Sequence, residues 1–132
     1  MMKKIILVQL FFLALSFCLF AEEMVNIGRQ KNIDISQVES SEVWLRVDYT
    51  GSISGVCGIK LESSLPISQV FQEVEFDKKA EKIDEFSASF SLTPSRYVDW
   101  LILKVASGES LKSVLKRLNM TLLASSVPCK TE

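Results

Sequence analysis

The sequence predicts a small α+β domain, in which an antiparallel sheet of about five strands packs against one amphipathic helix near the C-terminus. Two patterns support this prediction. Most of the chain from residue 42 to residue 105 alternates apolar and polar side chains, as half-buried strands do. A later stretch changes to the period of a helix. The alternative is an all-β sandwich with a peripheral helix.

The first 21 residues have the order of a secretory signal peptide. Lys3 and Lys4 precede an apolar run at 5–20, and the small residue Ala21 ends it. As a helix of about 16 residues, this run would be roughly 24 Å long, which is shorter than the hydrocarbon core of about 30 Å. The leader is therefore predicted to be removed on export, which places the mature protein in the periplasm or the medium.

Two alternatives would keep the chain on a membrane. The leader could be retained as an anchor, or Cys18 could carry a lipid, because Leu15 and Ser16 precede it as in lipoprotein signals. Phe17 is larger than the residue normally found directly before such a cysteine. Contact with a membrane is expected only in these two cases.

Without its leader, the chain has 111 residues, with 13 Lys and Arg against 16 Asp and Glu, and a net charge of −3. A nucleic-acid surface needs clustered positive charge, so nucleic acid is excluded as a partner. The length fits one domain. We predict a polar lead-in at 22–41, with one short strand near 33–38, followed by a single domain at 42–132.

The predicted mature chain keeps two cysteines, Cys57 and Cys129. In an oxidising compartment such a pair is more often bridged than free. A bridge would close a loop of about 72 residues and stabilise the fold by roughly 4 kcal/mol in the chain-entropy model. Both the bridged and the free state stay open on sequence grounds.

The first predicted strands form a hairpin. Residues 42–49 alternate cleanly, a turn follows at 50–52, and alternation resumes at 53–61. Gly55 and Gly58 in the second arm predict a bulge or a close backbone approach.

Three further segments complete the predicted sheet. Residues 68–76 and 85–92 alternate and are predicted strands, separated by a charged, solvated loop at 77–84. Residues 96–105 contain a continuous apolar run, which is typical of a strand covered on both faces. A buried helix is the alternative for that run, but its β-branched and aromatic residues favour the strand.

The helix is predicted from Glu109, because Leu111, Val114, Leu115 and Leu118 recur at helical spacing. Asn119 can adopt the left-handed conformation that ends a helix. Residues 121–127 are predicted to form a closing strand.

The sequence holds no histidine, which excludes Ser-His-Asp and Cys-His catalysis and histidine-ligated zinc. No metal or cofactor motif is present, and we predict that the protein is not an enzyme. Carboxylate pairs such as Glu73 with Glu75 would suit a small hydrolase, but a solvated strand face explains them better.

One surface is a candidate for binding. Trp44 and Arg46 lie on the strand face opposite its buried residues, Val43, Leu45 and Val47. An exposed apolar platform beside a cation would mark an interaction site. The alternative is that Trp44 packs beneath another element.

A second candidate comes from residues 105–121, VASGESLKSVLKRLNMT, which resemble the first half of a lysin motif, the small peptidoglycan-binding module. Gly108, Glu109 and Ser110 occupy the turn positions of that family, and the resemblance covers about 17 residues. It implies a glycan-binding surface at the start of the helix.

The function predicted from the sequence is that of an exported, non-enzymatic envelope or secreted domain that binds another protein of the envelope. The alternatives are a module that binds peptidoglycan or another glycan, and a small hydrolase.

Overall fold

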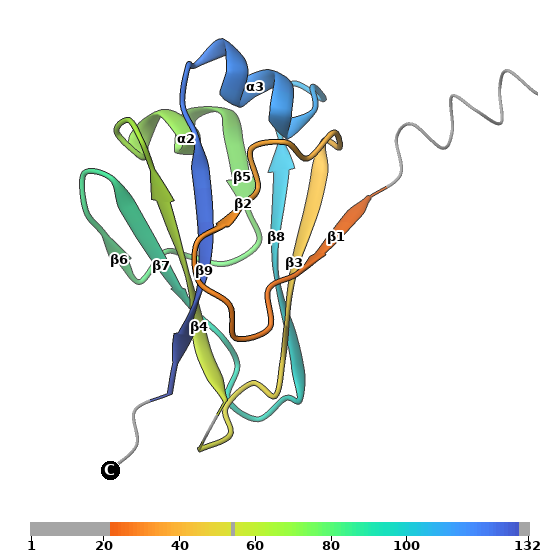
Figure 1. Ribbon diagram of the computed structural model, residues 1–132, viewed down its shortest axis with the longest axis vertical. Coiled ribbons are helices and arrows are strands. Elements are labelled where there is room, and N and C mark those ends of the chain that lie inside the picture. The colour runs from red at the N-terminus through yellow and green to blue at the C-terminus, as the bar shows by residue number, and fades with distance from the viewer. Residues whose placement is uncertain (1–21, 54, 130–132) are drawn as a thin grey trace, which may run out of the picture.

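The computed structural model describes residues 22–53 and 55–129, and over them the chain forms two facing β-sheets (Figure 1). The predicted leader at 1–21, including Cys18, lies outside the described residues. The prediction of an α+β domain with a single sheet is therefore wrong. Alternation along a strand shows that one face is buried, but it does not show which strands pair or how many sheets they form.

The first sheet, sheet A, has four strands. The β1 strand runs parallel to β3, while the pairs β3–β8 and β8–β5 are antiparallel. In spatial order the strands are β1 (Glu23–Asn26), β3 (Glu42–Asp48), β8 (Val98–Val105) and β5 (Val74–Phe76).

The second sheet, sheet B, has five strands, and all its neighbours are antiparallel. In spatial order they are β2 (Ile33–Asp34), β9 (Leu122–Pro128), β4 (Val56–Ser63), β7 (Ser87–Ser91) and β6 (Lys82–Ile83).

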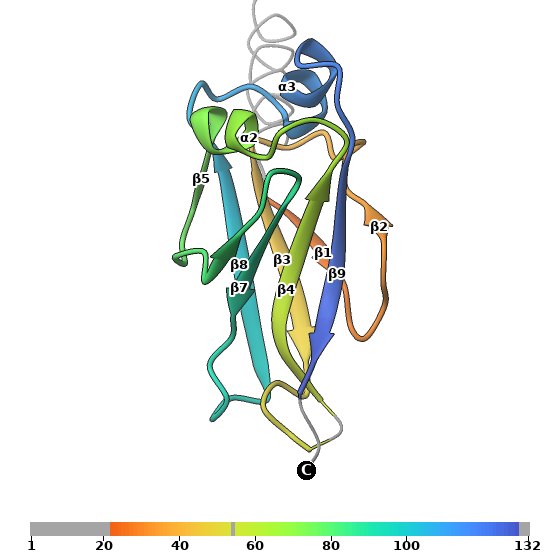
Figure 2. The same cartoon turned by 90° about the vertical axis from the view of Figure 1, so that its left-hand side faces the viewer.

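The hydrophobic core lies between the sheets. Figure 2 looks onto sheet B, with β3 and β8 of sheet A behind it. The alternating residues of β3 and β8 face inward from sheet A, and those of β4, β7 and β9 face them from sheet B. Phe76 of sheet A contacts Phe90 of sheet B, with ring centroids 5.0 Å apart. The lead-in contributes to this core through Ile27 and Ile35, which are fully buried.

The two helices of the described residues are short and lie at one end of the sheets (Figure 1). The first, α2 (Ser68–Glu73), occupies most of a segment predicted as a strand, and only its end continues as β5. The second, α3 (Leu111–Arg117), buries Leu111, Val114 and Leu115. Since β9 follows α3, the helix does not end the chain, and it is a cap on two sheets rather than a layer covering one.

The predicted hairpin is also wrong, although both of its strands exist. β3 pairs within sheet A and β4 within sheet B, so the segment 49–55 carries the chain from one sheet to the other. The predicted irregularity in the second arm is present as a register shift between Val56 and Gly58.

The structure pairs Cys57 with Cys129, whose Cα atoms lie 4.9 Å apart, and this is compatible with the bridged state of the two that the sequence left open. The backbone N–H of Cys129 also donates to the carbonyl of Gly55, at 3.1 Å. These contacts hold the end of β9 against the beginning of β4.

Candidate binding surface

The outer face of sheet A carries large side chains that are half-exposed. Trp44 and Arg46 come from β3, and Trp100 and Ile102 come from β8. The register places Trp44 opposite Ile102 and Arg46 opposite Trp100. We call these four residues the aromatic face.

The side chains of the aromatic face contact one another. The rings of Trp44 and Trp100 meet edge to face, with centroids 5.4 Å apart and planes at 78°. The Arg46 guanidinium carbon lies 5.4 Å from the centroid of Trp100, within the range of a cation–π contact. Arg46 Nε also donates to Asp48 Oδ1 at 3.0 Å. These contacts fix the rings without burying them.

Several donors on this face have no acceptor among the described residues. Trp44 Nε1 donates to Glu42 at 3.2 Å, but Trp100 Nε1 makes no hydrogen bond there. The bond from Arg46 to Asp48 uses Nε, and the two terminal nitrogens of Arg46 make none within the described part of the chain. The surface therefore offers both apolar area and unused donors.

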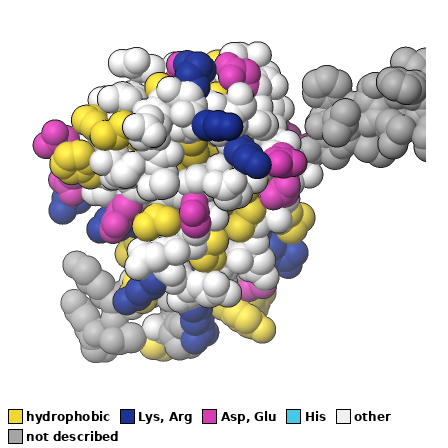
Figure 3. Space-filling model, turned by 45° about the horizontal axis from the view of Figure 1, so that its top comes forward, with side chains coloured by type: hydrophobic (Ala, Val, Ile, Leu, Met, Phe, Trp, Pro, Cys, Tyr) yellow, Lys and Arg dark blue, Asp and Glu magenta, His cyan; other side chains and the backbone are white. Residues whose placement is uncertain are grey.

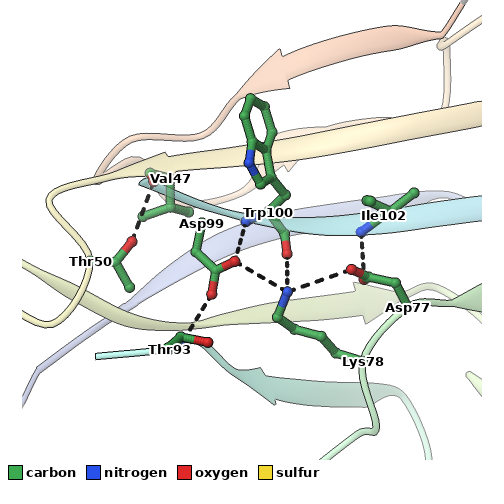
Figure 4. Close-up of polar contacts among 8 residues, drawn as sticks. All are labelled: Val47, Thr50, Asp77, Lys78, Thr93, Asp99, Trp100 and Ile102. Carbon is green, nitrogen blue, oxygen red and sulfur yellow. Dashed lines mark hydrogen bonds and ion pairs between the residues drawn. The ribbon is translucent and has the colours of Figure 1, made fainter. Parts of the chain in front are cut away.

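A buried polar network supports the aromatic face from beneath (Figure 4). The carboxylate of Asp99 accepts hydrogen bonds from the backbone N–H groups of Thr93 and Trp100, both at 2.8 Å. Lys78 Nζ lies 3.3 Å from Asp99 and also donates to the carbonyl of Trp100. Asp77 accepts from the backbone N–H of Ile102 at 2.8 Å. The two residues that β8 contributes to the aromatic face, Trp100 and Ile102, are thus held through their own backbones.

The charge of Asp99 is stabilised inside the fold. Burial by itself would raise the pKa of this carboxyl, but the bonds from Thr93 and Trp100 and the cation of Lys78 together hold its pKa below the ordinary value. The segment 77–84 was predicted to be a solvated loop, and for Asp77 and Lys78 that prediction is wrong. Their partners are distant in sequence, so no local pattern identifies them.

The aromatic face continues into one end of the sandwich. Arg46, Asp48 and Val98 line a hollow together with Tyr49 and Tyr97. Both tyrosines are exposed, at 64% and 84%. They lie on the loops that follow β3 and precede β8, at the end opposite the helices (Figure 1).

The second predicted group lies at the other end, where basic and acidic side chains are interspersed (Figure 3). Gly108 has a φ of 82° and forms the turn, and Ser110 caps α3 by accepting from the N–H of Ser113 at 3.1 Å. Arg117 bridges Glu73 and Glu109, at 3.1 and 3.2 Å. Hydrogen bonds from serines and the cation of Arg117 lower the pKa of Glu109.

The structure thus does not join the two groups of predicted site residues into one site. Trp44 and Arg46 lie on the outer face of sheet A, whereas Ser110 caps α3 and Glu109 accepts hydrogen bonds from the hydroxyl groups of two neighbouring serines. The resemblance to a lysin motif stays a prediction. The sequence also missed the role of Trp100, because it lies in an apolar run that was predicted to be covered on both faces.

The described residues contain no group of three or more His, Cys, Asp or Glu side chains that could hold a metal ion. None of their helices has the length and apolar character needed to cross a bilayer. No protein-family model, curated protein or solved structure matches the chain.

Proposed function

We propose that the protein is an exported, non-enzymatic domain that binds a protein of the cell envelope through the aromatic face. The observation that carries the proposal is the contact of Trp44, Trp100 and Arg46 with one another while all three stay half-exposed. Trp, Tyr and Arg are the residue types most enriched among the energetic centres of protein interfaces. Export is supported by the charge and hydrophobic pattern of residues 1–21.

The free donors indicate what the partner presents. Apolar side chains would cover the two indole rings, and carbonyl or carboxylate oxygens would accept from Trp100 Nε1 and the terminal nitrogens of Arg46. Such bonds gain strength when the surrounding apolar area excludes water. The network around Asp99 keeps β8 in place, so little ordering is needed on binding.

The test is cross-linking in cells that express the full chain, with the partner then purified and its binding measured. The paired variant Trp44→Ser and Trp100→Ser is expected to weaken binding by at least about tenfold, since hot-spot truncations cost 2 kcal/mol or more. The matched control changes Lys60→Ser and Glu62→Ser on the outer face of sheet B. Equal binding by both variants would contradict the proposal.

A further inference from the structure

The two exposed tyrosines belong to a shallow hollow of about 250 Å³ at the end of the sandwich. We call it the tyrosine pole, and its lining residues are Tyr49, Thr50, Gly51, Ser52, Pro94, Ser95, Arg96 and Tyr97. We propose that the tyrosine pole is a second binding site and that its ligand is a saccharide bearing a carboxylate. This site adjoins the aromatic face but contains neither of its tryptophans, and it goes beyond the proposed protein-binding function.

The backbone beneath the tyrosine pole is fixed. The N–H groups of Tyr49 and Thr50 both donate to the carbonyl of Tyr97, at 2.5 and 3.3 Å, so the two loops are tied together. Tyr49 has a φ of 60°, a conformation that bulky residues rarely adopt. The protein holds this unfavourable geometry at the point that presents a tyrosine to solvent.

Two glycines make this packing possible. Gly51 has a φ of 77°, and a Cβ there would lie 1.8 Å from the carbonyl oxygen of Pro94. A Cβ at Gly55 would lie 1.9 Å from the carbonyl oxygen of Tyr49. The loops therefore meet backbone to backbone, and a ligand would meet a surface that is already formed.

The chemistry of the lining favours a sugar. Both tyrosines line the hollow and are exposed, so their rings are available to stack on the apolar face of a pyranose, and neither phenol hydroxyl bonds to another described residue. Ser52 and Ser95 add hydroxyl groups beside the rings. Such a mixture of flat rings and hydroxyls matches a ligand that alternates C–H and O–H groups.

The charge of the lining selects an acidic sugar. Arg96 is the one charged residue of the hollow, and it forms no ion pair with any residue that the structure describes. The nearby carboxylate of Asp48 is already paired with Arg46, at 3.0 Å. A guanidinium can hold a carboxylate through two parallel hydrogen bonds between opposite charges, whereas the hydroxyl groups of a neutral sugar carry no charge to complement it.

The experiment measures binding of two trisaccharides to the mature domain by calorimetry and NMR: trigalacturonate, which carries carboxylates, and tri-N-acetylglucosamine, which is neutral. We expect trigalacturonate to bind more tightly. Tyr97→Ala removes an exposed ring while keeping the backbone carbonyl, and should weaken its binding by at least about tenfold, equivalent to 1.4 kcal/mol. Arg96→Gln should abolish the preference for the acidic sugar.

Two controls separate this site from the others. Glu109→Ala tests the region that resembles a lysin motif, and trigalacturonate binding should be unchanged in it. Trp44→Ser and Trp100→Ser should lose the protein partner and keep the sugar. The proposal is overturned if trigalacturonate does not bind, if its binding is insensitive to both changes at the pole, or if Tyr97→Ala affects the protein partner alone.

Discussion

The two sheets have outer faces of opposite character. On sheet B most outward residues around β4 are small or paired: Ser87, Ser89 and Ser125 lie around Lys60 and Glu62, whose charged groups are 3.0 Å apart, and β9 adds the aliphatic side chains of Leu123 and Val127 but no aromatic ring. On sheet A the corresponding positions carry two tryptophans, an isoleucine and an arginine. Both faces cover the same core.

Sheet B shows which residues are sufficient on a solvent-exposed sheet face that has no proposed binding role. Small polar side chains alternate with core residues, and the strands pair correctly. The large apolar residues outside sheet A are therefore not a requirement of the fold. Exposed apolar residues in contact with one another are the informative departure from this pattern, and they carry the proposed function.

The largest losses of stability are expected in the core, to which both sheets contribute fully buried leucines. Leu101 of β8 and Leu61 of β4 are both fully buried. Leu101→Ala and Leu61→Ala should each lower the free energy of unfolding by about 2–5 kcal/mol, because each leaves a cavity. Urea denaturation of a chain that comprises residues 22–132 measures this. A large loss in one variant and none in the other would show that the sheets do not share one core.

A smaller loss of stability is expected when the polar network around Asp99, beneath the aromatic face, is disrupted. Asp99→Asn leaves Lys78 facing an amide and should destabilise the domain by about 1–3 kcal/mol. Asp48→Asn is the matched control, since its ion pair is exposed and should contribute under about 1 kcal/mol.

Asp99→Asn should also change how the stability of the domain depends on pH. The folded-state pKa of Asp99 is lowered, so its contribution is complete above the ordinary value of 3.8 and is lost as pH falls through the folded-state pKa. Asp99→Asn should therefore lose less stability than the wild type over that acidic range. Parallel slopes of the urea midpoint against pH in the two proteins would contradict the role assigned to Asp99.

Local signals in the sequence were sufficient to locate individual elements. Alternation identified the strands that became β3 and β7, a continuous apolar run identified β8, and helical spacing identified α3. The left-handed conformation predicted for Asn119 is present, with a φ of 55°. Each of these features is determined by residues within a few positions of one another.

Features that depend on distant residues were missed. The assignment of β3 and β4 to different sheets depends on partners tens of residues away, as does the pairing of Lys78 with Asp99. Trp44 was recognised as a candidate, but the ring that it contacts was assigned to a covered strand. Periodicity cannot distinguish an apolar residue that faces the core from one that faces a partner.

The smallest predicted effect is the one that best sharpens the contrast between the outer faces. Trp100→Ala removes one ring of an edge-to-face pair. The loss of this ring contact should lower the free energy of unfolding by about 0.5–1.5 kcal/mol, in addition to the loss that comes from the apolar area the ring buries. Ser89→Ala, at the comparable position of sheet B, should stay within about 0.5 kcal/mol. Thermal unfolding of both variants measures the difference. If Trp100→Ala were as costly as Leu101→Ala, the ring would be a core residue, and the aromatic face would be explained by stability rather than by a partner.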